Sequence, residues 1–148
     1  MYSDFLTFKL DLTSALLIDR ANVAYRERWN LDVRALRVLR LVCAEPDTTP
    51  KEVSRRTLVE KTLLSKALAE LETRGLISRN AHPSDRRSVM LRATADGFEV
   101  ARASGVLGLA LEVELAEALT AGERKTLERL LDKLSNSLLR GESSAAPD

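Results

Sequence analysis

The sequence predicts a mainly α-helical fold of about six helices with one small β-hairpin. Three observations lead to this fold class. Apolar residues recur at three- and four-residue spacing over most of the chain, and helix-start signals precede several of these stretches. Between residues 76 and 93 the helical period gives way to two short strand-like runs joined by a polar turn.

The first predicted helix runs from about Ser3 to Arg28 and has two apolar stripes. A surface helix needs only one buried face, so two stripes require a partner on each side. In a chain of 148 residues, we expect the second partner to be another copy of the same chain. The stripes are Phe5, Phe8, Leu12, Ala15 and Leu16 on one side, and Leu6, Leu10, Leu17, Ala21 and Ala24 on the other.

Two helices are predicted next, separated by the turn Glu45-Pro46-Asp47. One starts at Leu31-Asp32 and ends near Cys43. The other begins at Pro50, because Thr49-Pro50-Lys51-Glu52 combines an N-cap hydroxyl, a proline at the first helical position and a glutamate suited to a capping box.

The fourth predicted helix runs from about Glu60 to Arg74, after a turn at residues 57–59. Leucines at helical spacing face the core, and Gly75 supplies a C-terminal stop. The outward face carries short hydroxyls and lysines, which suit the base edges and phosphates of a DNA major groove. An ordinary solvated helix face is the alternative. The outward residues are Lys61, Thr62, Ser65, Lys66 and Ala69.

The strand-like runs at residues 76–80 and 88–93 flank a polar turn that contains Asp85, Arg86 and Arg87. Two adjacent arginines at the tip of a hairpin are suited to the negative potential of a DNA minor groove. We expect Asp85 to hold the side chain of Arg87 in an extended pose. The alternative is a solvated hairpin with an incidental cluster of charges.

Helices also dominate the C-terminal part. Thr94 is predicted to cap a helix that runs to about Leu119, in which Gly105 and Gly108 permit either the close approach of another helix or a bend. Thr120-Ala121-Gly122-Glu123 is a second capping box. It opens a last helix with a leucine stripe, and residues 141–148 are expected to form a flexible tail. The stripe is Leu127, Leu130, Leu131, Leu134 and Leu138.

Charge is divided unevenly along the chain. The whole chain carries +1, but residues 49–94 hold ten basic and five acidic residues, a net of +5, and the remainder carries −4. This division favours the approach of one face to phosphate. No apolar run is long enough to span a bilayer, and the N-terminus lacks the charged region of a signal peptide, so we expect a bacterial cytoplasmic protein without a membrane partner.

Three segments resemble the winged helix-turn-helix of the MarR (multiple antibiotic resistance regulator) family of bacterial transcription factors. They are Leu71-Glu72-Thr73-Arg74-Gly75-Leu76-Ile77, the turn Asp85-Arg86-Arg87, and Leu91-Arg92-Ala93-Thr94-Ala95-Asp96-Gly97. The resemblance covers about residues 31–97. Ala93 departs from it, since a larger residue is expected before Thr94.

The resemblance implies four parts: an N-terminal dimerisation helix at 1–30, a DNA-binding head at 31–97, C-terminal dimerisation helices at 98–140 and a tail at 141–148. It also implies a homodimer that represses transcription from a near-palindromic operator and releases it on binding a small aromatic or phenolic effector. With the outward face of the fourth helix in the major groove and the wing in the minor groove, the candidate DNA-binding residues are Lys61, Thr62, Ser65, Lys66, Arg86 and Arg87, with Asp85 supporting the wing. A winged-helix module that binds proteins instead of DNA is the alternative.

Candidate effector-binding residues lie at the end of the first helix, where Tyr25 and Trp29 can stack on an aromatic ring and Arg20 or Arg26 can pair with a carboxylate. The alternative is that Trp29 fills the core and the arginines form structural ion pairs. Cys43 is either an oxidant sensor or a small apolar packing residue. With one histidine, His82, and one cysteine, the chain offers neither a metal cluster nor a nucleophile-base pair. We therefore expect no resident cofactor and no enzyme.

Overall fold

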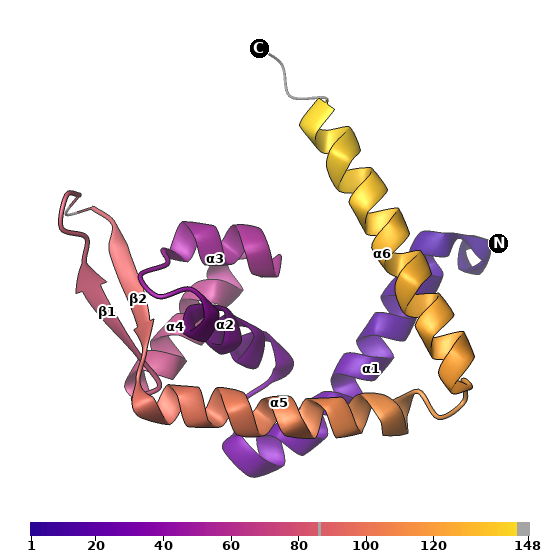
Figure 1. Cartoon of the computed structure of the whole chain (residues 1–148), viewed down its shortest axis with the longest axis horizontal. Coiled ribbons are helices and arrows are strands. Elements are labelled where there is room, and N and C mark those ends of the chain that lie inside the picture. The colour runs from indigo at the N-terminus through magenta and orange to yellow at the C-terminus, as the bar shows by residue number, and fades with distance from the viewer. Residues whose placement is uncertain (86, 145–148) are drawn as a thin grey trace. The chain divides into compact units, whose positions relative to one another are not determined.

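The computed structural model describes residues 1–85 and 87–144, which contain six α-helices, a short 3-10 helix and one antiparallel hairpin (Figure 1). The predicted fold class is confirmed. Contacts divide the chain into a first unit, Met1–Leu111, and a second, Glu112–Asp148. The elements are the 3-10 helix Tyr2–Asp4, α1 Leu6–Trp29, α2 Val33–Ala44, α3 Pro50–Thr57, α4 Lys61–Thr73, β1 Ile77–Ala81, β2 Val89–Ala93, α5 Ala95–Leu115 and α6 Ala121–Ser144.

The core of the first unit is built around α2, against which α1, α3, α4 and β2 pack (Figure 1). The apolar side of α2 is fully buried, and α3, α4 and β2 each add fully buried side chains from their inner faces. This packing holds the short α3 and α4 beside the hairpin, since helices of their length are marginal by themselves. The most deeply buried apolar residues are Leu31, Leu36, Val38, Leu39, Val42, Val53, Leu71 and Leu91.

Side-chain caps place the starts of three helices within one or two residues of the prediction. Asp32 accepts a hydrogen bond from the Ala35 N–H (2.9 Å), and Thr49 accepts one from the Glu52 N–H (3.3 Å). Glu60 accepts from the N–H groups of the first turn of α4. The capping box predicted at Thr49 is only half formed, because the Glu52 carboxylate accepts hydrogen bonds from the Arg55 guanidinium in place of the second bond.

The hairpin is joined along its β2 edge to the segment that precedes α3. Ile77 pairs with Ala93, and Ala81 with Val89, as a regular antiparallel ladder. Leu91 on β2 also bonds the segment just before α3, through Asp47 N–H to Leu91 O (3.1 Å) and Leu91 N–H to Thr48 O (2.8 Å). The hairpin is therefore held on the same frame as the start of α3.

Helix α5 begins directly after β2. Thr94 Oγ1 accepts a hydrogen bond from the Gly97 N–H (3.0 Å) and donates one to the Gly75 carbonyl (2.6 Å), as its predicted role as a cap requires. The helix ends at Leu115, four residues before the predicted end, in a turn stabilised by the Leu119 N–H to Ala116 O bond (3.0 Å). The apolar period continues into this turn, so the sequence pattern alone did not mark the end of the helix.

The two glycines in the middle of α5 differ in their surroundings. A Cβ built on Gly108 would lie 2.6 Å from the Tyr25 hydroxyl of α1, whereas none of the described atoms lies within 4 Å of such a position on Gly105. Of the two alternatives, close helix approach applies to Gly108.

The second unit is dominated by α6. Its capping box is complete, since the Thr120 N–H donates to Glu123 (3.0 Å) and the Glu123 N–H donates to Thr120 Oγ1 (3.1 Å). The helix continues through Gly141 to Ser144, into the stretch expected to be a tail, because one glycine in a helix interior costs only about 1 kcal/mol. Residues 145–148 lie outside the described residues. The leucine stripe of α6 is exposed, from 39% at Leu131 to 62% at Leu138.

Helix α1 also leaves large apolar side chains open to solvent. Those of Leu6, Leu12, Leu16 and Val23 are between 48% and 69% exposed. This exposed apolar surface is available to the second partner that the sequence predicts for this helix. Over the described residues, no helix is both long and apolar enough to cross a bilayer.

Candidate nucleic-acid interface

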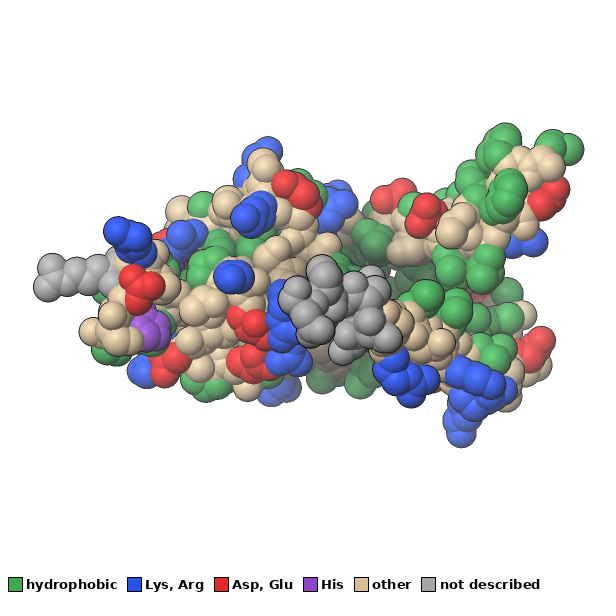
Figure 2. Space-filling model, turned by 90° about the horizontal axis from the view of Figure 1, so that it is seen from above, with side chains coloured by type: hydrophobic (Ala, Val, Ile, Leu, Met, Phe, Trp, Pro, Cys, Tyr) green, Lys and Arg blue, Asp and Glu red, His purple; other side chains and the backbone are tan. Residues whose placement is uncertain are grey.

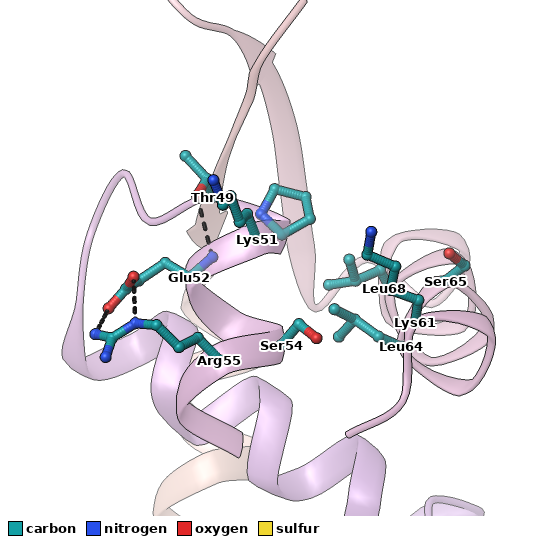
Figure 3. A pocket seen from close by; sticks show the side chains of 10 residues that line it. Thr49, Lys51, Glu52, Ser54, Arg55, Lys61, Leu64, Ser65 and Leu68 are labelled. Atoms are coloured by element: carbon teal, nitrogen blue, oxygen red, sulfur yellow. Dashed lines mark hydrogen bonds and ion pairs between the residues drawn. The ribbon is translucent and has the colours of Figure 1, made fainter. Parts of the chain in front are cut away.

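A hollow of about 780 Å³ lies between α3 and the edge of α4 where its exposed and buried faces meet (Figure 3). Two leucines of α4 form its apolar floor, and its polar rim carries three basic side chains and one acidic side chain. Side chains from both helices point toward this space. It is lined by Thr49, Pro50, Lys51, Glu52, Ser54, Arg55, Lys61, Leu64, Ser65 and Leu68.

Charge on this rim is only partly neutralised. Arg55 Nε lies 3.0 Å from Glu52, and that hydrogen bond is the main reason why the pKa of Glu52 is lowered. Lys51 and Lys61 are exposed on either side of the hollow. Figure 2 shows basic side chains distributed over this end of the first unit, with acidic side chains among them. The arrangement suits a polyanion that passes over α3 and α4.

Helix α4 presents the predicted polar face. Lys61, Thr62, Ser65 and Lys66 are all exposed, whereas Leu64, Ala67, Leu68 and Leu71 on the opposite side are buried. The helix starts at Glu60, whose carboxylate accepts from the N–H groups of Thr62 (3.0 Å) and Leu63 (3.3 Å). These hydrogen bonds, that of Thr62 first, lower the pKa of Glu60. The charged cap keeps the basic N-terminal end of α4 ordered.

The wing turn is held by Asp85, but differently from the prediction. Asp85 Oδ1 accepts from the backbone N–H of Arg87 (3.0 Å), and Oδ2 accepts from the Ser88 hydroxyl (3.2 Å). The short carboxylate therefore fixes the backbone of the turn, in the manner of an Asx turn, and not the Arg87 guanidinium. Arg87 is exposed, and Arg86 lies outside the described residues.

His82 stands at the base of the wing turn and is half-buried. Its Nδ1 accepts a hydrogen bond from the Ser84 N–H (3.2 Å), and its backbone N–H donates to the Ser88 carbonyl (3.0 Å). The histidine therefore belongs to the scaffold of the turn.

Two ion pairs that the sequence reasoning missed connect the wing to the helices. Arg92 on β2 makes a two-pronged contact with Asp47, with Nε and Nη2 at 2.5 and 3.0 Å from its oxygens, and this bonding lowers the pKa of Asp47. Arg79 on β1 lies 2.8 Å from Glu72 on α4. The Asp47–Arg92 pair spans 45 residues of sequence, and no local pattern marks it.

The four candidate effector residues are only partly brought together. Tyr25 is 5% exposed and its ring lies 6.3 Å from that of Trp29, which packs against the core. Arg26 lies 3.9 Å from Asp32, and Arg20 is exposed on α1. These positions agree with the structural alternative for Trp29 and Arg26.

A different arginine stands beside Tyr25. Arg40 of α2 is half-buried, its guanidinium lies 5.8 Å from the centre of the Tyr25 ring, and its Nη2 donates to the buried Ser104 hydroxyl of α5 (3.1 Å). Among the described residues, its buried Nε–H has no hydrogen-bond partner. Sequence reasoning missed Arg40 because its partners, Tyr25 and Ser104, lie on two other helices and no local pattern marks them.

Cys43 is half-buried beside α5, and burial raises the pKa of its thiol. A thiol of this kind is not activated as a thiolate, so the packing interpretation fits its surroundings. The described residues contain no cluster of three or more potential metal ligands.

Comparison with known proteins identifies the arrangement. The sequence profile of the MarR family matches residues 29–88, the segment that contains α2, α3, α4, β1 and the wing turn. Over this segment the chain is similar to the MarR family.

Three curated proteins show the likeness along the sequence, and one of them is named as a transcriptional repressor. The multiple antibiotic resistance protein MarR of Escherichia coli is 29% identical over 117 residues, 78% of this chain and 81% of that protein. The Salmonella typhimurium protein of the same name is 36% identical over 58% of this chain and 60% of its own length. The HTH-type transcriptional repressor Rv2887 of Mycobacterium tuberculosis is 28% identical over 66% of this chain and 70% of that protein.

Similar solved structures extend the likeness to most of the chain. The crystal structure of wild-type E. coli MarR without ligand superposes with a TM-score of 0.77 and 27% identity, over 88% of this chain and 96% of that one. Two further structures, at 24% identity, share the fold. They are a mutant of E. coli MarR complexed with operator DNA (TM-score 0.78, 90% and 97% covered) and Rv2887 complexed with p-aminosalicylic acid (0.73, 88% and 98%).

Proposed function

We propose that this protein is a MarR-family, sequence-specific regulator of transcription that binds double-stranded DNA, and that its role is regulatory and not catalytic. The exposed polar face of α4, set between the basic rim of α3 and the wing, is the observation that carries the proposal. The E. coli relative with this fold has been solved with operator DNA, which supports the same mode of action.

In this proposal, α4 enters the major groove by its N-terminal half. Thr62 and Ser65 supply short hydroxyls for base edges, and Lys61 and Lys66 supply charge for phosphates. Arg87, and Arg86 beside it, reach the neighbouring minor groove from the wing. Because Asp85 fixes the backbone of the turn, the wing meets DNA with little loss of conformational entropy.

We further propose a homodimer acting as a repressor on a near-palindrome in the bacterial cytoplasm. The exposed apolar side chains of α1 and α6 supply surfaces that a second copy can bury. A two-fold axis presents two α4 helices to successive major grooves about 34–36 Å apart. The operator half-sites are therefore one helical turn apart.

The DNA-binding proposal is tested by in vitro selection from a randomised duplex library, followed by fluorescence anisotropy with the selected duplex at several salt concentrations. Specific binding with affinity that falls steeply as salt rises is expected. Failure to enrich any sequence, or weak binding that salt hardly changes, would reject the proposal and favour the protein-interaction alternative.

For the effector, we propose a small aromatic carboxylate bound beside Tyr25, with Arg40 as the cation. A half-buried arginine whose buried Nε–H lacks a partner among the described residues, next to an aromatic ring, supports this choice over Arg20 and Arg26. Benzoates, hydroxycinnamates and their thioesters are screened by thermal shift and by release of the selected operator. Arg40→Leu should abolish the response while Arg20→Leu keeps it, and a library without any active compound would remove the effector proposal.

A further inference from the structure

Arg74, at the C-terminal end of α4, is bonded to the end of α1. Its Nη1 donates a hydrogen bond to the Asn30 carbonyl (2.9 Å), and its Nη2 donates one to the Trp29 carbonyl. Trp29 is the last residue of α1, and Asn30 is its C-cap, with a left-handed backbone (φ 51°). A single side chain thus joins helix ends that are 44 and 45 residues apart in the sequence.

The chemistry of this contact suits arginine better than lysine. The last carbonyls of a helix lack partners within the helix, and they carry the partial negative charge of the helix dipole. A guanidinium presents several N–H groups in one plane and can bridge two neighbouring oxygens, whereas the ammonium of lysine acts as a single point of charge. Glu70, with Oε1 3.6 Å from Arg74 Nη1, faces the guanidinium from the preceding turn of α4.

The contact also has a special place in the fold. Helices α1 and α4 each pack against α2, so their apolar contacts run through a third helix. Apolar packing is non-directional and allows small rotations, whereas a two-pronged hydrogen bond fixes an angle. Arg74 therefore restrains the orientation of α4 relative to α1 directly.

Resting on the proposed function, we infer that Arg74 is a positioning residue that sets the half-site spacing of the operator. In the proposed homodimer, α1 forms part of the shared interface and α4 enters the groove. The angle between these helices then determines the distance between the two α4 helices. Loss of the bridge widens the range of spacings that the dimer accepts, and leaves the reading of each half-site unchanged.

The experiment compares duplexes that carry the selected half-sites at the native spacing, at spacings changed by one and two base pairs, and as a single half-site. The proteins are wild type, Arg74→Lys, Arg74→Ala and the control Arg102→Ala, which loses an exposed pair with Glu99 on α5. Lysine keeps the charge and the aliphatic stem, so Arg74→Lys tests the bridge even where alanine impairs folding.

We expect wild type and Arg102→Ala to bind the respaced duplexes about tenfold more weakly than the native spacing, a usual size for coupling between two sites. Arg74→Lys and Arg74→Ala should reduce that ratio to about threefold or less, with single-half-site affinity unchanged, because only the coupling is weakened.

Three outcomes would overturn the inference. Arg74→Lys with a wild-type spacing preference would mean that charge alone matters. Equal weakening on every duplex with a smaller salt dependence would identify Arg74 as a phosphate contact. A lower melting temperature with spacing preference intact would identify a stabilising role only. If the wild-type protein itself shows no preference among spacings, the proposed action as a dimer on two half-sites fails. That result differs from the three above, which overturn only the role inferred for Arg74.

Discussion

Replacing Gly97 with alanine should destabilise this protein, whereas the same replacement at Gly105, eight residues along α5, should stabilise it. A Cβ on Gly97 would lie 2.0 Å from the Leu76 carbonyl oxygen and 3.0 Å from its carbonyl carbon. Around the corresponding position on Gly105, the described part of the chain places no atom within 4 Å. The same substitution in one helix thus meets a backbone clash at Gly97 and open space at Gly105.

The magnitude at Gly97 follows from the separation that the methyl group requires. Ordinary contact for a Cβ begins at 3.4 Å, so the Leu76 carbonyl and α5 must part by more than an ångström. The Leu76 oxygen also accepts a hydrogen bond from the Thr94 N–H (3.0 Å), which this movement would break. Overpacking costs about 1–3 kcal/mol where side chains can adjust, and a backbone clash belongs at about the upper end.

At Gly105 the expected sign is reversed, because alanine in a helix interior is favoured over glycine by about 0.5–1 kcal/mol. Urea denaturation followed by circular dichroism measures both variants, at one protein concentration because the stability of an oligomer depends on it. A Gly97→Ala protein as stable as wild type would refute the reasoning. So would a Gly105→Ala protein destabilised to the same extent as Gly97→Ala.

Three further predictions concern the DNA-binding face and its caps. Lys66→Ala should weaken binding to all duplexes and reduce the slope of log affinity against log salt by about 0.9. Ser65→Ala should instead relax base preference at one position, at a cost of about 1–3 kcal/mol in binding free energy. Fluorescence anisotropy measures both effects. Thr49→Ala should lower the free energy of unfolding by about 1 kcal/mol through loss of the α3 cap, and the matched Thr13→Ala in exposed α1 should not. Because the folded-state pKa of Glu60 is lowered, its stabilisation is present above its unfolded pKa and is lost as pH falls through the folded value. In Glu60→Gln, the urea midpoint of unfolding should therefore decrease less than in wild type between neutral and acid pH. An equal decrease in both proteins would contradict this role of Glu60.

Much of the site could be predicted because it depends on short-range chemistry. The caps at Thr49 and Thr94 and the left-handed Gly75 (φ 70°) follow from local hydrogen bonding and sterics, which four or five neighbouring residues specify. The polar face of α4 follows from helical periodicity alone, since burying its leucines fixes where Ser65 and Lys66 point.

The remainder depends on contacts between residues distant in sequence. The two-pronged contact of Asp47 with Arg92 and the bridge from Arg74 to the end of α1 join residues 44 to 45 positions apart. Any of the chain's many arginines had the chemistry for such contacts. Only packing around α2 decided which ones met a partner.

The amino-acid sequence by itself determined the helical period, the caps, the wing turn and the concentration of positive charge between residues 49 and 94. Tertiary structure alone decided that Arg40 stands with Tyr25 and that Gly97 leaves room for the Leu76 carbonyl. The physical reason is range. Backbone sterics and capping act over a few residues, whereas the partners of a buried or bridging group are set by how the helices pack.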